Sequence, residues 1–519
     1  MMRGLMRNGT EPSTPYEPPE FLNLADFFLD DRVCEGRGDR LALHTDAGDF
    51  TYADVQRRAN RWANLLRGKG VRREERVILA MPDGLEYVGV LFGVLKLGAV
   101  VVMANPGMPP ADVDALLAYT GASWIVADPD HAPHFAAELA TPHEVRGAVL
   151  AGRDGEALLA GSPDTFPNVR THRDDPAIWL FSGGTTGRPK AVIQTHRAFA
   201  YTTECYGRGV MRYGEDDVTL AVPKLYFGYA TGANLFFPFR AGGSSVLFAE
   251  PPTPEAIFDR MRRHRPTLLI NVPTMIQRMV AHPDARAQDL SSLRACTSAG
   301  EALPEELDRR WRDTFGVDLL DGLGTAEMWH IFLSNRPGEA RPGTVGCVVP
   351  GFEVKVCDDE GREVPRGETG WLHVKGGARA IGYWRDLEKT ERAFRGEWYV
   401  SGDLIRMDED GFVTYQGRGD ELLKVSGKWL APAEVEGCLL QHAAVAECAV
   451  VGMPDAAGLV KPVAFVVARE RRDGLDEELR AFVRERLAAY KHPREVRFLE
   501  GLPRTHLGKV DRGALRRQG

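Results

Sequence analysis

A segment rich in glycine and threonine has the composition of a phosphate-binding loop. Residues 182–190 read SGGTTGRPK and lie between two apolar runs. Glycines let backbone N–H groups approach an anion closely, and the hydroxyl groups and a lysine add donors and charge. The common nucleotide-triphosphate loop has its lysine directly after the last glycine, whereas Lys190 lies three residues past Gly187. The segment therefore predicts phosphate binding by another kind of loop, with a flexible turn between two strands as the alternative.

Three further segments carry single polar residues close to glycines. Glu327 in LGTAE is a carboxylate suited to a hard cation such as Mg²⁺, although a glutamate that begins a helix is an equal alternative. Asp403 follows Gly402 in YVSGD, and Lys509 follows Gly508 near the C-terminus. Taken alone, these two residues would be interpreted as an exposed turn aspartate and a solvated terminal lysine.

Size and charge favour an enzyme with more than one domain that acts on small molecules. The chain has 519 residues, too many for one hydrophobic core, and its net charge of -8 argues against a nucleic-acid partner. Seven cysteines without a CxxC pair indicate neither a disulfide framework nor a zinc site, and predict a reducing, cytoplasmic setting. The longest apolar stretch, residues 87–105, is interrupted by Lys96, so it predicts a buried helix that enters a strand and no membrane span.

Apolar and amphipathic runs alternate between residues 217 and 327, which predicts βαβ units and a parallel sheet. Thr253 and Thr274 are the expected N-caps of two of the helices. Nearer the N-terminus, a helix capped by Thr51 and closed by Gly70 leads to a strand and repeats the pattern. Strands are expected at 217–223, 244–250, 266–273 and 293–300, and helices at 253–265, 274–282 and 304–316.

The pattern changes near Thr344, where alternating residues broken by glycine and proline predict antiparallel hairpins. After residues 411–430 (GFVTYQGRGDELLKVSGKWL) the expected order is helix, strand, strand, helix, strand. The predicted fold is therefore α/β, with a large N-terminal domain that includes a small antiparallel subdomain and a small mobile α+β C-terminal domain. The expected boundaries are a disordered arm at 1–21, the large domain at 22–419 with its antiparallel part at about 344–419, and the C-terminal domain at 420–519.

In order and wording, these segments resemble the motifs of the adenylate-forming superfamily, which includes acyl- and aryl-CoA ligases, peptide-synthetase adenylation domains and firefly-type luciferases. SGGTTGRPK matches the family loop [ST]-[SG]-G-[ST]-T-G-x-P-K at every position, and LGTAE, YVSGD, GRGDELLKVSG and PRTHLGKVDR follow in family order. The resemblance covers residues 22–512. It implies that a carboxylate first attacks the α-phosphorus of ATP and releases pyrophosphate, and that a thiol then displaces AMP from the acyl-adenylate.

The resemblance implies a role for each matching residue. Lys509 is expected to bridge the carboxylate and the α-phosphate, and Glu327 to hold Mg²⁺. Rotation of the C-terminal domain about the hinge Asp420 is expected to exchange the Lys509 segment at the active site for the segment that carries Lys424. Ser426 and Gly427 are expected on the coenzyme A side. The expected ATP contacts are Ser182, Gly183, Gly184, Thr185, Thr186, Gly187 and Lys190 for the phosphates, and Gly300, Glu301, Ala302, Asp321, Gly322, Thr325, Asp403 and Arg418 for adenine and ribose.

Residues 224–248 and 324–335 are similar to the acid-binding segments of benzoate-CoA ligases and their relatives. Ordinary packing in an aromatic cluster is the alternative for Tyr229 and its neighbours. Gly228 is expected to leave room for a ring substituent, so 2-aminobenzoate and hydroxybenzoate compete with benzoate as the substrate. The implied aryl-acid pocket consists of Gly228, Tyr229, Gly324, His330 and Ile331.

Two residues depart from the family motif that carries the glutamate. Leu323 and Ala326 stand where the family has tyrosine and threonine, and Thr325 is the expected substitute for the lost threonine hydroxyl. The implied substrates are an aromatic carboxylic acid, ATP and coenzyme A. The phosphopantetheine arm of a carrier protein is an alternative acceptor of the aryl group. An inactive nucleotide-binding regulator is the alternative from outside the enzymes. A homodimer is expected only from the family resemblance.

Overall fold

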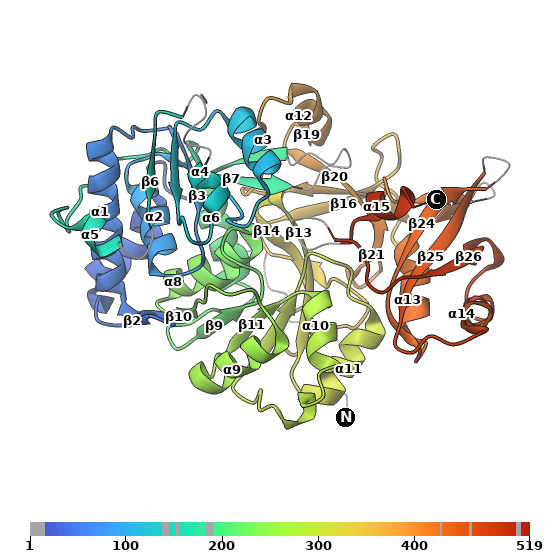
Figure 1. The fold of residues 1–519 in the computed structure, drawn as a ribbon. Coiled ribbons are helices and arrows are strands. Elements are labelled where there is room, and N and C mark those ends of the chain that lie inside the picture. Colours follow the sequence, from blue (N-terminus) through green and yellow to red (C-terminus); the bar gives the residue numbers. More distant parts are fainter. Residues whose placement is uncertain are drawn as a thin grey trace, which may run out of the picture.

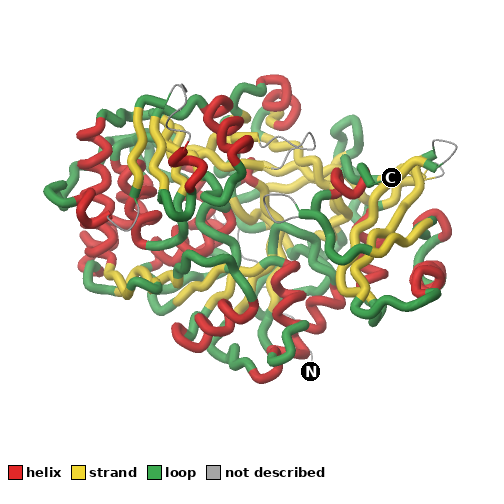
Figure 2. Tube along the Cα trace, in the orientation of Figure 1, coloured by secondary structure: helices red, strands yellow, loops and turns green. Residues whose placement is uncertain are grey.

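The structure is a computed structural model, and it describes residues 16–137, 145–151, 155–182, 190–425, 428–455, 459–504 and 510–518. A large N-terminal domain contains two mixed sheets and an antiparallel sheet, and a smaller C-terminal domain lies at one end of the molecule (Figure 1). Helices pack against the faces of the sheets, some on the outside and some in the interior of the large domain, as the red and yellow tubes in Figure 2 show. The predicted mixed α/β fold is therefore confirmed.

The first sheet has seven strands in the order β18-β8-β7-β4-β3-β5-β6. Five neighbouring strands, from β7 to β6, are parallel, whereas β8 and β18 add antiparallel pairs at one edge. The strands are β3 (Arg76–Ala80), β4 (Val100–Met103), β5 (Trp124–Ala127), β6 (Gly147–Leu150), β7 (Pro176–Ser182), β8 (Lys190–Thr195) and β18 (Gly382–Tyr383). The associated helices are α1 (Tyr52–Lys69), α2 (Leu85–Lys96), α3 (Pro110–Thr120), α4 (Pro133–Ala137) and α5 (Gly155–Leu159).

Local sequence signals set the ends of α1. Thr51 caps the helix and forms a capping box with Asp54, and Gly70 closes it in the left-handed conformation at φ 99°, so both predicted ends are confirmed. The apolar stretch 87–105 forms α2 followed by β4, as expected. Lys96, the charge within this stretch, is 1% exposed and forms an ion pair with Asp30.

The second sheet has nine strands in the order β15-β14-β13-β12-β11-β9-β10-β1-β2. The strands from β13 to β1 are parallel, which confirms the predicted βαβ units. Antiparallel pairing begins with β14, earlier than the expected change near Thr344, because the chain turns back on itself directly after β13. The strands are β1 (Leu41–Thr45), β2 (Gly48–Thr51), β9 (Val218–Ala221), β10 (Ser244–Val246), β11 (Leu268–Asn271), β12 (Ala295–Ser298), β13 (Leu319–Thr325), β14 (His330–Ser334) and β15 (Cys347–Val348).

The helices of this part confirm one predicted N-cap and correct the other. The hydroxyl of Thr253 accepts the Ala256 N–H at the start of α9. Helix α10 begins at Pro273, so Val272 and not Thr274 is its N-cap. The helices are η1 (Asp26–Asp30), η2 (Val33–Arg37), α6 (His196–Thr202), η4 (Thr203–Arg208), α7 (Gly228–Thr231), η5 (Gly232–Phe236), α8 (Phe237–Ala241), α9 (Pro254–His264), α10 (Pro273–Val280), η6 (Ala285–Ala287), α11 (Glu305–Phe315) and η7 (Ala326–Met328).

The third sheet is antiparallel throughout, and β18 of the first sheet lies between two of its strands in sequence. It consists of β16 (Glu353–Cys357), β17 (Thr369–Lys375), β19 (Phe394–Arg395), β20 (Trp398–Met407) and β21 (Val413–Arg418), with α12 (Leu387–Ala393) before β19. Its longest strand, β20, carries the YVSGD segment and pairs Asp403 with Arg418 on β21. The predicted antiparallel hairpins are therefore present.

After Leu430 the C-terminal elements follow the predicted order of helix, strand, strand, helix, strand; two short strands precede them and a short helix follows them. They are β22 (Leu423–Val425), β23 (Lys428–Leu430), α13 (Pro432–Leu440), β24 (Val445–Pro454), β25 (Val460–Ala468), α14 (Leu475–Arg484), η8 (Ala489–Lys491), β26 (Glu495–Phe498) and α15 (Arg512–Arg516). Gln277 on α10 donates a hydrogen bond to the Ala446 carbonyl, which ties the small domain to the large one.

The predicted N-terminal arm lies mostly outside the described residues. Its last residues are fixed, because the Pro18 carbonyl accepts a hydrogen bond of 2.6 Å from the Arg173 guanidinium and the Glu20 carbonyl accepts the Arg173 N–H at 2.8 Å. All seven cysteines are free thiols. In the parts of the chain that the structure describes, every helix is too short or too polar to cross a bilayer.

Candidate active site

The carboxyl ends of strands from the two mixed sheets meet at one place. After β9, the Leu225 N–H is held by both oxygens of the Asp83 carboxylate, which follows β3, at 3.0 and 3.1 Å. Gln194 on β8 donates a hydrogen bond of 2.6 Å to the Ala326 carbonyl on η7. Ligands of α/β proteins bind outside such strand ends, so this junction is the expected location of a site.

The phosphate-loop residues that the structure describes lie at this junction. Ser182 ends β7 and Lys190 begins β8, and the two residues are paired in the antiparallel register. The Lys190 ammonium lies 5.6 Å from the centre of the Tyr383 ring. The other predicted phosphate contacts, Gly183, Gly184, Thr185, Thr186 and Gly187, lie outside the described residues.

Glu327 is a buried carboxylate, 5% exposed, on the short helix η7. Its Oε1 accepts a hydrogen bond of 2.8 Å from the Tyr383 hydroxyl. The described residues contain no group of three His, Cys, Asp or Glu side chains that could hold a metal ion by themselves. A single carboxylate fits Mg²⁺, which takes most of its ligands from water and phosphate oxygens.

Thr325 lies two residues before Glu327 and carries an unsatisfied hydroxyl. Its Oγ1 is buried and has no hydrogen-bond partner among the described residues. A buried polar group without a partner is costly unless a ligand or water satisfies it. The Thr325 hydroxyl is therefore available to a ligand beside Glu327. It lies next to Ala326, the residue that stands where the family motif has a threonine.

A network of charged and hydroxyl groups surrounds Asp403, which is 4% exposed. Its carboxylate accepts hydrogen bonds from the Ser401 hydroxyl and, at 3.3 Å, from the Tyr415 hydroxyl. The Arg418 guanidinium lies 3.7 Å from Asp403 and 3.2 Å from the Asp420 carboxylate. The two acidic groups raise the pKa of Arg418 even though burial lowers it, so Arg418 remains a cation between the predicted ribose contact and the predicted hinge.

The predicted adenine contacts follow β12 or lie on β13. Gly300, directly after β12, has a φ of +89°, a conformation that favours glycine. The Glu301 carboxylate accepts a hydrogen bond of 2.7 Å from the Thr274 hydroxyl, and Ala302 beside it is exposed. Asp321 and Gly322 lie together on β13, and Asp321 pairs with Ser298 in the register. Burial raises the pKa of Asp321 to about 8, and its Oδ1 has no hydrogen-bond partner in the described residues.

Tyr229 and His330 form one wall of the predicted acid pocket. The Tyr229 hydroxyl shares a hydrogen bond of 2.7 Å with Thr297, and the Tyr229 carbonyl lies 3.0 Å from His330 Nε2. Burial lowers the pKa of His330 to about 3, so the imidazole is neutral at physiological pH. Its Nδ1 has no hydrogen-bond partner among the described residues. The wall is thus aromatic and uncharged.

The tight turn between β13 and β14 sets the position of His330. Trp329 and His330 have positive φ angles of 26° and 83°, which side chains other than glycine rarely adopt. In the register Gly324 pairs with the buried Ile331, and a β-carbon at Gly324 would lie 2.1 Å from the His330 carbonyl oxygen. Gly324 is therefore required for the close approach of the two strands.

Leu180 and Trp329 are the nearest side chains to the position that a β-carbon would take at Gly228. A β-carbon at Gly228 would lie 3.1 Å from Leu180 Cδ1 and 3.6 Å from the Trp329 indole nitrogen. A side chain larger than glycine at this position would therefore crowd Leu180. The room that Gly228 is expected to leave for a ring substituent stays a prediction.

The predicted residues of the C-terminal domain are described only in part. Lys424 lies on β22 and pairs with Trp429 on β23. Asp420 lies directly before this hairpin and pairs with Arg418. Lys509, Ser426 and Gly427 lie outside the described residues.

Sequence reasoning missed several residues that contact the predicted ones. Tyr383, Gln194 and Thr297 each hydrogen-bond to a predicted site residue or its neighbour. None belongs to a motif, because their partners are distant in sequence and become neighbours only through strand pairing. Asp83 is similar; burial raises the pKa of Asp83 to about 6.

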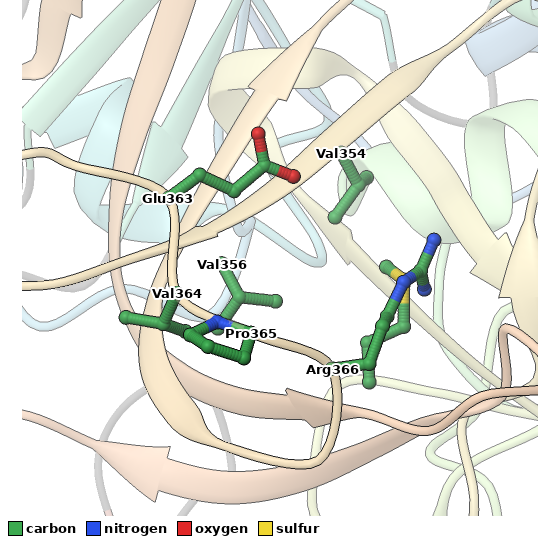
Figure 3. Close-up of a pocket in the computed structure, with 7 residues that line it drawn as sticks. Val354, Val356, Glu363, Val364, Pro365 and Arg366 are labelled. Atoms are coloured by element: carbon green, nitrogen blue, oxygen red, sulfur yellow. The ribbon is translucent and has the colours of Figure 1, made fainter.

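A surface hollow of about 420 Å³ lies on the antiparallel sheet (Figure 3). Its lining is largely aliphatic, with the charged groups of Glu363 and Arg366 beside it. The lining residues are Val354, Val356, Glu363, Val364, Pro365, Arg366 and Met407, and they are different residues from the predicted site.

Comparisons with known proteins agree with this geometry. Family models for the AMP-binding enzyme and for the AMP-binding enzyme C-terminal domain match residues 30–384 and 434–509. A benzoate–CoA ligase of Thauera aromatica is 40% identical over 507 residues, which is 96% of each chain.

Two solved structures are similar over nearly the whole chain. The anthranilate CoA ligase AuaEII in complex with anthranoyl-AMP has a TM-score of 0.92 and 36% identity over 96% of this chain and 98% of that one. A benzoate CoA ligase from Burkholderia xenovorans LB400 has a TM-score of 0.88 and 39% identity over 95% of this chain and 100% of that one. The chain therefore belongs to the family of AMP-binding, adenylate-forming enzymes.

Proposed function

We propose that the protein is an ATP-dependent, AMP-forming aryl-CoA ligase whose acid is benzoate or a benzoate with a small substituent. One observation carries the proposal: the β13–β14 hairpin places the aromatic wall at His330 three residues from the Glu327 carboxylate. An acid bound against this wall would have its carboxylate close to phosphates held near Glu327. The similar enzymes described above act on benzoate and anthranilate.

The pocket chemistry supports a small aromatic acid. The ring would lie against Tyr229 and the neutral His330, and the Tyr229 hydroxyl is already engaged with Thr297. Leu180 and Trp329 lie beside Gly228 and would limit the size of a ring substituent there. Single small groups change binding by only about 1–3 kcal/mol, so the preferred acid among benzoate, 2-aminobenzoate and hydroxybenzoate is a matter for measurement.

In the first half-reaction, an oxygen of the acid attacks the α-phosphorus of ATP, the bond to the β,γ-diphosphate breaks, and pyrophosphate leaves. Lys509 would offset the charge that develops at the α-phosphate. The segment from Ser182 to Lys190 would hold the leaving diphosphate, and Asp403 would accept hydrogen bonds from the ribose hydroxyls. Mg²⁺ held through Glu327 would neutralise phosphate charge.

In the second half-reaction, the thiol sulfur of coenzyme A attacks the acyl carbon, its proton is lost, and AMP leaves. A rotation at Asp420 would exchange the Lys509 segment for the hairpin that carries Lys424, Ser426 and Gly427. The ion pair between Arg418 and Asp420 lies at this point, directly after β21. A homodimer and a cytoplasmic location stay predictions from the sequence.

The proposal is tested by a substrate panel in which pyrophosphate release and thioester formation are measured separately. Benzoate, 2-aminobenzoate, 4-hydroxybenzoate, cinnamate and a medium-chain fatty acid are compared by kcat/KM, with coenzyme A or a phosphopantetheinylated carrier protein as acceptor. An aryl acid should be the best substrate and coenzyme A the acceptor. A preference for the fatty acid would refute the pocket assignment, and transfer to the carrier protein alone would refute the acceptor.

Lys509→Ala tests the division between the two half-reactions. The variant should lose formation of the adenylate while it retains thiolysis of a supplied aryl-adenylate. Equal loss of both reactions would contradict the assignment of Lys509 to the first step.

A further inference from the structure

Tyr383 contacts residues from two of the predicted ATP-binding segments. It lies on β18, which pairs with β8 so that Tyr383 is opposite Val192, two residues after Lys190. The Tyr383 hydroxyl donates a hydrogen bond of 2.8 Å to Glu327 Oε1, and the Lys190 ammonium lies 5.6 Å from the centre of its ring. One side chain thus connects the end of the phosphate segment with the predicted metal ligand.

The hydroxyl of Tyr383 acts as a donor to Glu327. A phenol O–H is a donor and an ionised carboxylate oxygen is an acceptor, so the contact of 2.8 Å has one direction. Glu327 Oε1 is then occupied, whereas Oε2 accepts no hydrogen bond from any residue that the structure describes. A hydrogen bond to one oxygen fixes the plane of a carboxylate and leaves the other oxygen for a ligand.

Backbone contacts fix Tyr383 itself. The Ala380 N–H donates a hydrogen bond of 2.8 Å to the Glu327 carbonyl, and the Tyr383 N–H donates one of 3.0 Å to the Thr390 hydroxyl. The Tyr383 ring also packs against Phe394, with ring centres 5.5 Å apart. The hydroxyl is therefore held in place independently of the bond to Glu327.

We propose that Tyr383 is a positioning residue that orients the Glu327 carboxylate toward the divalent cation bound with ATP. The inference rests on the proposed function, which assigns the cation to Glu327. Groups that orient a metal ligand in this way typically change metal affinity by about 10- to 100-fold when they are removed. Tyr383→Phe should therefore weaken cation binding while it preserves the ring packing.

The test measures binding, not turnover. Free Mn²⁺ is counted by electron paramagnetic resonance during titration of the full-length protein saturated with a non-hydrolysable α,β-methylene ATP analogue. Tyr383→Phe should raise the Kd for Mn²⁺ about 10-fold or more. Its affinity for the analogue without metal, and its thermal unfolding midpoint, should stay close to those of the unmodified protein.

Tyr119→Phe is the matched control. The Tyr119 hydroxyl donates a hydrogen bond of 2.8 Å to the carbonyl of Trp384, the residue after Tyr383, and accepts one of 3.3 Å from the Ala191 N–H. Neither partner is Glu327. This control removes a tyrosine hydroxyl from the same edge of the sheet. It should leave Mn²⁺ binding unchanged.

Glu327→Gln separates the inference from the proposed function. If Glu327→Gln leaves the Kd for Mn²⁺ unchanged, the assignment of the cation to Glu327 fails and the inference fails with it. If Glu327→Gln weakens binding but Tyr383→Phe does not, only the role of Tyr383 is overturned. An equal loss in Tyr383→Phe and Tyr119→Phe would also overturn it, because general displacement of the sheet edge would then be the cause.

Discussion

Replacement of Gly324 by alanine should damage catalysis through a steric conflict that the backbone cannot avoid. The new β-carbon would lie 2.1 Å from the His330 carbonyl oxygen and 2.5 Å from its carbonyl carbon. An ordinary contact begins at 3.4 Å, so the two strands must separate by about 1.3 Å. Both partners are backbone atoms in paired strands, and no side-chain rotation can relieve the contact.

The expected loss follows from this displacement. A shift of about 1 Å in a catalytic arrangement costs roughly 100-fold in rate, which corresponds to about 2.7 kcal/mol at 1.36 kcal/mol for each tenfold change. The same crowding should lower stability by about 1–3 kcal/mol. Because Gly324 pairs with Ile331, the residue after His330, and lies three residues before Glu327, kcat/KM should fall for both the acid and ATP.

Pyrophosphate release under steady-state conditions measures the effect, together with thermal unfolding. The control is Gly437→Ala in α13, where an added β-carbon meets no atom within 4 Å. This control should keep full activity and gain up to about 1 kcal/mol of stability, because alanine favours helix over glycine. Unchanged kcat/KM and stability in Gly324→Ala would refute the argument from close strand approach.

Three other changes have defined outcomes. The pKa of Asp321 is raised from its ordinary value to about 8, so the folded protein holds one more proton than the unfolded chain between these two values. The free energy of unfolding of the unmodified protein, compared with that of Asp321→Asn, should therefore fall by up to about 4 kcal/mol as pH rises from 5 to 8. Unfolding midpoints that change in parallel with pH in the two proteins would contradict this. Asp403→Asn removes the negative charge of the carboxylate that accepts hydrogen bonds from Ser401 and Tyr415. The variant should raise the KM for ATP about 10-fold or more, with little change in the KM for the acid. An equal rise in both KM values would exclude a ribose contact. Arg512→Ala leaves the partly buried Glu436 carboxylate without its two-point partner and should destabilise the C-terminal domain by about 3 kcal/mol, measured by denaturant unfolding. Arg517→Ala removes an exposed contact of 3.9 Å and should have no effect. Equal stability of the two variants would contradict a role for the pair of Arg512 and Glu436.

The sequence by itself determined the architecture and the order of the motifs. Runs such as Val77 to Ala80 and the capped helix from Thr51 to Gly70 are set by local hydrophobicity, capping residues and glycine conformation, so they could be read without tertiary contacts. The phosphate segment was also recognisable, because Lys190 and the glycines around it are adjacent in the chain. The expected N-cap at Thr274 was wrong because Pro273 already begins the helix.

Only the tertiary structure decided which side chains meet at the junction of the two sheets. Strand register brings Tyr383 to Glu327, and the turn after β13 brings the Tyr229 carbonyl to His330, although these partners are 56 and 101 residues apart. Burial then fixes their ionisation, as in the neutral imidazole of His330 and the raised pKa of Asp321. The neighbours of Gly228 could not be read from the sequence either, because Leu180 and Trp329 are distant from it in the chain and the volume beside a residue is set by its neighbours in space.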